Sequence, residues 1–420
     1  MRLDRKQSRT RNAVLLLSFL LPVAGCHTAP RSNYQFESQP SNVLAAVAKS
    51  SMDPQLGISP SGTLYLLALY GNEEKRRLGM AVSHNGGDTF DPPIPISDGN
   101  ATVRAQGESS PNLFATSTSI YALWEQSNAS GPSDLMFARS PSGQSFDRPI
   151  EVTDKTRPSF NGFASLGVAP DGDVYAVWLD GRNPPEMHGT FSVYLARSTD
   201  RGASFKPNVL VSRGACPCCR PKVALGTGGA VYVIWRKVFH GNVRDMVVSA
   251  SNDAGETFAA PVRVAEDNWK INGCPESGAT ALVAGHRLYV AWMTETTPQQ
   301  AGVKLTWSDD GAKSFAPPVL VSKGLLDANH PVLSASGDSD TVLVFQARDA
   351  GESQNWSPQS PYLVEIDAAG KTSLPAKIPA GASVSYPTVV SGSAGRVFFA
   401  WNQSGNGGAN IFFSRGRRSF

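Results

Sequence analysis

The sequence predicts an all-β protein, a β-propeller made of four-stranded blades. Three observations predict it: a turn motif recurs along the 420-residue chain, a short aromatic strand recurs in phase with it, and prolines mark the start of most units. A fixed period of this size is typical of repeated supersecondary units that bury their faces against their neighbours. We therefore expect similar sheets arranged in a ring.

The turn motif has the pattern S-x-[DNS]-x-G-x-[TS]-F. Its copies are SHNGGDTF (83–90), STDRGASF (198–205), SNDAGETF (251–258) and SDDGAKSF (308–315), with the shorter SPSGQSF (140–146). The starts at 83, 140, 198, 251 and 308 give a period of 53 to 58 residues. A degenerate copy, EIDAAGKTS (365–373), and a short one, SRGRRSF (414–420), extend the series.

The aromatic strand recurs once in each unit. The copies are YLLALY (65–70), YALW (121–124), YAVW (175–178), YVIW (232–235), YVAW (289–292), VLVF (342–345) and VFFAW (397–401). Each unit reads as four short strands separated by turn signals. Counting either repeat predicts seven blades, with six as the alternative if one weak unit is not a blade. Because the last turn motif ends the chain, the segment 34–47 is the candidate for the missing outer strand.

These motifs and their spacing resemble the Asp-box (bacterial neuraminidase repeat) β-propeller superfamily, which includes the sialidases, over residues 51–420. The resemblance implies a structural role for the turn: its Asp binds backbone amides, its Gly takes a positive φ and its Phe packs under the blade. Sialidases proper have six blades, so a count of seven departs from the enzymes.

The N-terminus predicts export. Five basic residues precede the apolar run AVLLLSFLLPVAG, as in a secretory signal peptide over residues 1–25. The junction Val23-Ala24-Gly25-Cys26 resembles a bacterial lipobox, which implies a lipid on Cys26. Residues 26–50 then form an anchored linker that includes the possible ring-closing strand, and 51–420 form the propeller. We expect a bacterial cell-envelope lipoprotein at the outer membrane or periplasmic face, with the membrane contacted through its anchor.

The charge balance argues against a nucleic-acid partner. Without the leader, which carries five of the 38 basic and one of the 35 acidic residues, the chain has 33 basic against 34 acidic residues. Such a chain has no electrostatic reason to bind a polyanion.

Three cysteines lie within four positions of the segment GACPCCRP (214–221). The repeat phase places them at the start of the fourth blade, facing the segment 272–276 of the fifth. Three interpretations stay open for Cys216, Cys218, Cys219 and Cys274: disulfides, a zinc or copper(I) site with His330 as an optional further ligand, or a redox pair. The C-x-C-C spacing argues against one loop wrapping a tetrahedral metal, since adjacent cysteines are expected to point apart.

The resemblance to sialidases also implies a chemistry: three arginines that clamp a carboxylate, a Tyr nucleophile with a Glu, and an Asp acid. By position near the channel mouth, the catalytic candidates are Tyr386, Glu276 and Asp245, with Asp180 as an alternative acid. The substrate-binding candidates are Arg220, Arg244, Arg348 and His330. No Arg-Ile-Pro motif of the family occurs in this sequence.

Two functions follow as hypotheses. The first is a sialidase-like protein that binds, and hydrolyses, a glycan or small acidic ligand at the channel mouth. The second is a non-enzymatic binding or assembly propeller, with a metal or disulfide site and a protein partner at its rim.

Overall fold

The computed structural model describes residues 29–419, apart from 38, 46–49, 72–75, 98–101, 106, 129–130, 156–158, 188, 337–339, 351–357, 382 and 406–407. The predicted signal peptide and Cys26 therefore lie outside the described residues. Within the described ranges, no helix is long and apolar enough to cross a membrane. The helical elements found there are three short 3-10 turns: η1 (Gly107–Ser109), η2 (Thr227–Gly229) and η3 (His240–Asn242).

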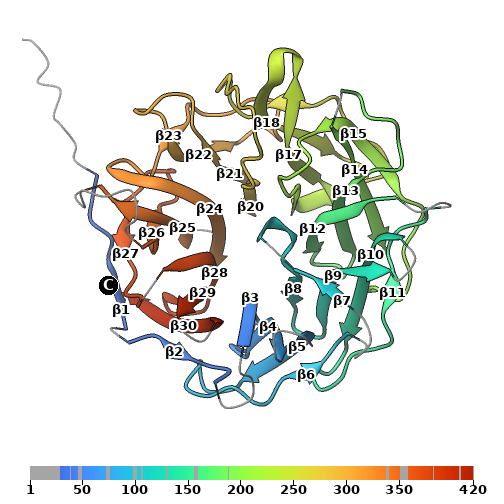
Figure 1. Cartoon of the computed structure of the whole chain (residues 1–420). Coiled ribbons are helices and arrows are strands. Elements are labelled where there is room, and N and C mark those ends of the chain that lie inside the picture. The colour runs from blue at the N-terminus through green and yellow to red at the C-terminus, as the bar shows by residue number, and fades with distance from the viewer. Residues whose placement is uncertain are drawn as a thin grey trace, which may run out of the picture.

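The strands form antiparallel sheets that stand side by side around a common centre (Figure 1). The first sheet contains β3 (Ser50–Ile58), β4 (Leu64–Gly71), β5 (Arg76–Ser83) and β6 (Ile94–Pro95). The second contains β7 (Thr102–Arg104), β8 (Asn112–Ala115), β9 (Ile120–Asn128), β10 (Gly131–Ser140) and β11 (Ile150–Glu151). In both sheets, each long strand pairs with its neighbours in the chain.

The third sheet is larger. It contains β12 (Asn161–Val168), β13 (Val174–Asp180), β14 (Phe191–Ser198), β15 (Val209–Ala215), β16 (Lys222–Leu225), β17 (Val231–Phe239), β18 (Val243–Ser251) and β19 (Val262–Arg263). Its two halves, β12–β15 and β16–β19, meet through the residue pair Ala215 and Lys237.

The remaining sheets return the chain to its start. The fourth contains β20 (Thr280–Ala284), β21 (Arg287–Thr294), β22 (Gly302–Ser308) and β23 (Val319–Leu320). The fifth contains β24 (Leu325–Ser336), β25 (Asp340–Asp349), β26 (Ser360–Ile366) and β27 (Ala376–Lys377). The last contains β28 (Val384–Ser391), β29 (Arg396–Gly405) and β30 (Gly408–Arg418), to which the N-terminal β1 (Tyr34–Phe36) and β2 (Ser41–Asn42) are added by pairing with β30.

The core lies between neighbouring sheets. Five tryptophans of the aromatic strands are fully buried: Trp124, Trp178, Trp235, Trp292 and Trp401. One apolar cluster joins Leu123 of β9 to Trp178 of β13, and another joins Val248 of β18 to Trp292 of β21. Because β13 is buried at every position, its sheet needs a neighbour on each face. The apolar strands thus stack the sheets around the centre.

The turns at 83–90, 198–205, 251–258 and 308–315, here called the repeat turns, share one hydrogen-bond pattern. In the second, Ser198 Oγ donates to Asp200 at 2.7 Å and accepts from the Gly202 amide at 2.8 Å, and Asp200 accepts from the Ser204 amide at 2.9 Å. Gly202 has a φ of +80°, and a Cβ there would lie 2.6 Å from Phe137 of the neighbouring sheet. Each repeat turn therefore satisfies its own backbone and packs against strands of a neighbouring repeat unit.

Candidate functional site

The first strands of four units contain, in their first half, a β-bulge with a residue of positive φ. These residues are Asp53, Phe163, His330 and Tyr386, with φ of 57°, 55°, 50° and 52°. The strand register shifts at each of these places. Non-glycine residues in this region cost about 1–3 kcal/mol and cluster at functional sites. A bulge also re-aims the side chain it carries.

Side chains of neighbouring sheets hold three of these bulges. The Phe163 amide donates to Glu125 Oε1, the Tyr386 amide to Gln346 Oε1 at 2.7 Å, and the Asp53 amide to Asn402 Oδ1 at 2.9 Å. Each acceptor directly follows a buried aromatic residue of the repeated strand: Trp124, Phe345 and Trp401. The same hydrogen bond, from the amide of a bulge residue to a side-chain oxygen of a neighbouring sheet, therefore occurs three times at this end of the ring.

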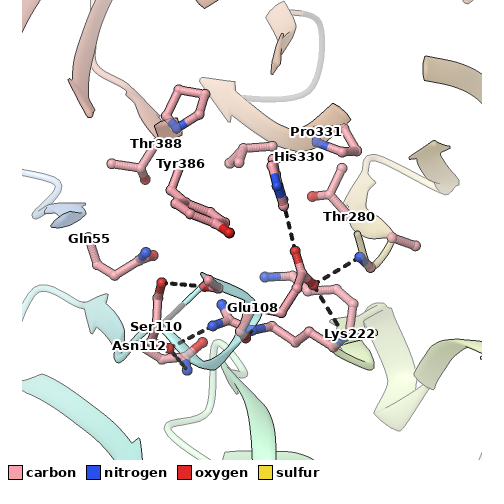
Figure 2. A pocket seen from close by; sticks show the side chains of 16 residues that line it. Gln55, Glu108, Ser110, Asn112, Lys222, Thr280, His330, Pro331, Tyr386 and Thr388 are labelled. Atoms are coloured by element: carbon pink, nitrogen blue, oxygen red, sulfur yellow. Dashed lines mark hydrogen bonds and ion pairs between the residues drawn. The ribbon is translucent and has the colours of Figure 1, made fainter. Parts of the chain in front are cut away.

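A cavity of about 120 Å³ lies among these bulges and is lined by residues from several sheets, including Glu108, Arg220, Lys222, His330 and Tyr386. Figure 2 shows His330 pointing at Glu108, with Tyr386 beside them. The distance from His330 Nδ1 to Glu108 Oε1 is 3.0 Å, and the ring centres of His330 and Tyr386 are 4.4 Å apart. We call this the narrow cavity.

Glu108 connects several of the residues that line the narrow cavity. Its Oε2 accepts hydrogen bonds from the Gly278 amide at 2.8 Å and the Arg220 amide at 3.2 Å. Burial opposes its ionisation, but the His330 hydrogen bond, the charges of His330 and Arg220 and the Gly278 amide together lower the pKa of this carboxyl. Glu108 is therefore an ionised carboxylate that joins strands from opposite parts of the ring.

The Arg220 guanidinium donates hydrogen bonds to backbone carbonyls. Its Nε donates to the Glu108 carbonyl at 2.6 Å and its Nη2 to the Ser110 carbonyl at 2.7 Å. These bonds hold the η1 loop against the start of β16. Arg220 thus fixes Glu108 in place while adding positive charge to the cavity.

Two further groups of the narrow cavity have shifted pKa values. Burial, aided by the charge of Arg220, lowers the pKa of Lys222 to about 8. Burial, aided by the charges of Glu108 and Glu276, raises the pKa of Tyr386 to about 12. At neutral pH the Tyr386 phenol is therefore protonated, and a base is needed to remove its proton.

A wider pocket of about 600 Å³ adjoins the narrow cavity and shares Glu108 and Tyr386 with it. Its other lining residues include Arg104, Glu125, Phe160, Phe163 and Glu276. Burial raises the pKa of Glu125 to about 7, against the lowering effect of the Phe163 amide and the Arg220 charge. A carboxylic acid with this pKa is suited to proton transfer near neutral pH. We call this the wide pocket.

The structure brings together some of the residues that the sequence singles out. Arg220 and His330 line the narrow cavity, Glu276 lines the wide pocket, and Tyr386 lines both.

The other candidates lie elsewhere and are held by local partners. Asp245 pairs with Arg263 at 3.2 Å, Arg348 pairs with Asp327 at 2.8 Å, and Arg244 donates to the Gly273 carbonyl at 2.8 Å. The alternative acid, Asp180, is buried and pairs with Arg182 at 2.9 Å. An arginine clamp formed by Arg220, Arg244 and Arg348 is therefore not assembled in this structure.

The three clustered cysteines are brought together more closely than their spacing predicts. Cys216, Cys218 and Cys219 are buried, and their sulfur atoms all lie within 4.8 Å of one another. The expectation that adjacent cysteines point apart is wrong here, because Pro217 and Cys218 form a turn and not a strand. Cys274 is exposed and free, outside this group. Hydrogen bonds from Cys218 and Cys219 lower the pKa of Cys216.

Three important residues were missed as candidates from the sequence: Glu108, Glu125 and Lys222. Glu125 directly follows the YALW strand, at the same place as Gln346 and Asn402, so its repeat position was a usable signal. Lys222 directly follows Pro221 at the start of an inner strand. Glu108 lies in the loop before Pro111, at the entry to an inner strand, so its repeat position was a usable signal as well.

Comparison with solved structures agrees with this architecture. The chain is similar to a protein of unknown function from Dyadobacter fermentans, with a TM-score of 0.53 and 17% identity over 76% of this chain and 98% of that one. It is similar to the Trypanosoma rangeli sialidase in complex with sialic acid, with a TM-score of 0.52 and 13% identity over 92% of this chain. The chain covers 60% of that enzyme's length.

A third similar structure is the phage phi92 endosialidase, with a TM-score of 0.50 and 10% identity over 93% of this chain and 70% of that one. No protein-family model and no curated protein matches the sequence. At this low identity the likeness concerns the fold: an all-β arrangement of four-stranded antiparallel sheets shared with β-propeller enzymes that include sialidases.

Proposed function

We propose that this protein is a sialidase-like β-propeller that binds a glycan at the mouth of its central channel and hydrolyses a glycosidic bond there. We count seven blades, because the weakly joined halves of the third sheet, β12–β15 and β16–β19, behave as two units. The repeat turns act as Asp-boxes, a reading supported by their shared Ser–Asp hydrogen bonds.

The observation that carries the proposal is the wide pocket, where the acid Glu125 shares the lining with Glu276 and Tyr386. Glycosidases need one protonated acid at the leaving oxygen and a nucleophile or base on the other side of the sugar. Glu125, with a pKa of about 7, supplies the acid. Tyr386 supplies the nucleophile, and Glu276 accepts its proton.

The lining also suits a sugar. The rings of Phe160 and Phe163 lie with their centres 6.1 Å apart, tilted by 43° to each other, and contribute apolar surface to the wide pocket. Carboxylates, an arginine (Arg104) and a phenol contribute hydrogen-bonding groups. Such a mixture of apolar walls and few convergent polar groups is typical of small-molecule sites. Because the arginine clamp is not assembled, the proposal extends to neutral as well as acidic glycans.

We further propose export and anchoring. Residues 1–25 serve as the signal peptide, and the lipid on Cys26 holds the propeller at the cell envelope. What supports this is the basic, apolar and small-residue order of the leader. A glycan-binding site exposed outside the cytoplasm would then meet cell-surface or environmental sugars.

A panel of 4-methylumbelliferyl glycosides, with a sialoside and several neutral sugars, tests the proposal. We expect fluorophore release from at least one of them, and a loss of at least 100-fold in kcat/KM for Glu276→Gln and Tyr386→Phe. Glu256→Gln, on an exposed loop of a repeat turn, is the matched control and should keep full activity. Absence of turnover on the whole panel would show that the hydrolysis proposal is wrong.

A further inference from the structure

The cysteine cluster lies beside the channel mouth but takes no part in the proposed glycan chemistry. Cys216, Cys218 and Cys219 are 0%, 6% and 1% exposed. The Cys216 and Cys218 sulfur atoms are 3.8 Å apart, nearly twice the length of a disulfide bond. Sulfur atoms bound to one cation at about 2.3 Å lie about 3.8–4.0 Å from each other. The Cys216–Cys218 separation is that of a thiol–thiol hydrogen bond, and it also fits two thiolates that share one metal ion.

The donors around the cluster are soft. Among the described residues, the group of potential ligands contains cysteine sulfurs and no carboxylate or imidazole. Val238 belongs to the same buried cluster, and Met187, whose side chain carries a thioether, packs against it. Thiolates and thioethers select soft cations such as copper(I), whereas imidazole and carboxylate suit harder ions.

Positive charge surrounds the cluster. Arg236 is 1% exposed, and its terminal nitrogens donate to the carbonyls of Ser277 at 3.1 Å and Met293 at 2.8 Å, with no carboxylate partner in the described structure. Both of these bonds come from Nη2, while Nη1 donates to the Arg244 carbonyl at 3.2 Å and Nε has no hydrogen-bond acceptor in the described part of the chain. Arg244 Nη1 lies 3.4 Å from Cys216 Sγ. A buried cation without a counter-charge is costly, so this arrangement calls for negative charge at the sulfurs.

We propose that Cys216, Cys218 and Cys219 bind one copper(I) ion as three thiolates, with Met187 covering the site. On binding, the three thiols release three protons to solvent. The ion adds one positive charge to three negative sulfurs, and Arg236 and Arg244 offset the remaining two negative charges. Zinc fits less well, because its structural sites use four Cys, His or carboxylate ligands and the cluster offers three such ligands.

This site is distinct from the glycan pocket but joined to it by the chain. Cys219 directly precedes Arg220, whose amide and guanidinium hold Glu108. Copper binding would therefore stiffen the segment that positions Glu108 in the narrow cavity. Either proposal stands if the other fails, because copper binding and glycoside turnover are measured separately.

The test is an anaerobic titration of the reduced full-length chain with copper(I) buffered by bathocuproine disulfonate. We expect one equivalent to bind the wild type, and binding to be lost in Cys216→Ser, Cys218→Ser and Cys219→Ser. Cys26→Ser and Cys274→Ser are the matched controls and should bind one equivalent each. Met187→Leu should weaken binding about tenfold while keeping the stoichiometry.

Circular dichroism and thermal unfolding of each apo variant separate loss of ligands from loss of fold. On the wild-type chain alone, copper-edge X-ray absorption should give sulfur-only coordination near 2.3 Å. Nitrogen or oxygen ligands, equal loss of copper in Cys274→Ser, or no copper bound by a chain with all thiols free would overturn the proposal. So would stoichiometric zinc that copper(I) does not displace.

Discussion

The two ends of the sheets differ in how they use polar residues. At the repeat turns, short side chains satisfy their own backbone in the same way each time, and the carboxylates are exposed. At the channel mouth, Glu108, Glu125 and Lys222 are held in the interior with shifted pKa values, on or beside strained bulges. The repeat therefore builds the scaffold, while the candidate site lies where the units differ from each other.

The largest expected effect on stability comes from removing the Glu108 carboxylate. Glu108→Ala leaves His330, Arg220 and the Gly278 amide without their shared acceptor, so we expect a loss of about 3–5 kcal/mol in the free energy of unfolding. Urea denaturation measures it. Glu256→Ala removes an exposed carboxylate with ion pairs of 3.5 and 3.6 Å, and should cost less than about 0.5 kcal/mol. Equal losses in the two variants would show that a carboxylate at the channel mouth and one at a repeat turn contribute equally to stability.

The next effect is a pH dependence of stability. Because the folded-state pKa of Glu125 is raised to about 7, its protonated form stabilises the fold fully below the unfolded-state pKa of about 4.3. This stability is lost as the pH rises toward 7, by on the order of 3 kcal/mol. Urea midpoints between pH 4 and pH 8 should therefore fall more steeply for the wild type than for Glu125→Gln. Parallel curves would contradict the shifted pKa.

A repeat turn should respond more weakly. Asp200→Ala removes hydrogen bonds to the Ser204 amide and to Ser198, but the exposed turn lets water replace them. We expect a loss of about 1 kcal/mol in the free energy of unfolding and no change in ligand binding. A loss as large as that of Glu108→Ala would show that the turns, too, carry critical buried interactions.

The repeats allowed the all-β, four-stranded architecture to be predicted, because each aromatic strand and turn had to bury its apolar side against a neighbour. They also placed Tyr386, Glu276, Arg220 and His330 near the channel mouth, where they line the two cavities. Position within the unit, more than residue type, made that prediction possible.

The repeats did not reveal which polar groups meet. The bulges at Asp53, Phe163, His330 and Tyr386 depend on strand register, which the local pattern does not encode. Glu108 lies in an entry loop of the repeat, but its partners, the Gly278 amide and His330, come from other sheets. Arg244 and Arg348 find local partners instead of joining Arg220. The turn at Pro217 likewise decides that adjacent cysteines converge.

The central claim is that the channel mouth is a site for acid-assisted glycoside hydrolysis, and the pH profile of kcat/KM tests it most directly. On whichever glycoside the wild type cleaves, kcat/KM should fall as the pH rises through about 7, because Glu125 loses the proton it donates. Glu125→Gln should lower kcat/KM at least 100-fold and abolish its fall at high pH, the basic limb of the profile. A profile that keeps its basic limb, with full activity, in Glu125→Gln would contradict the account.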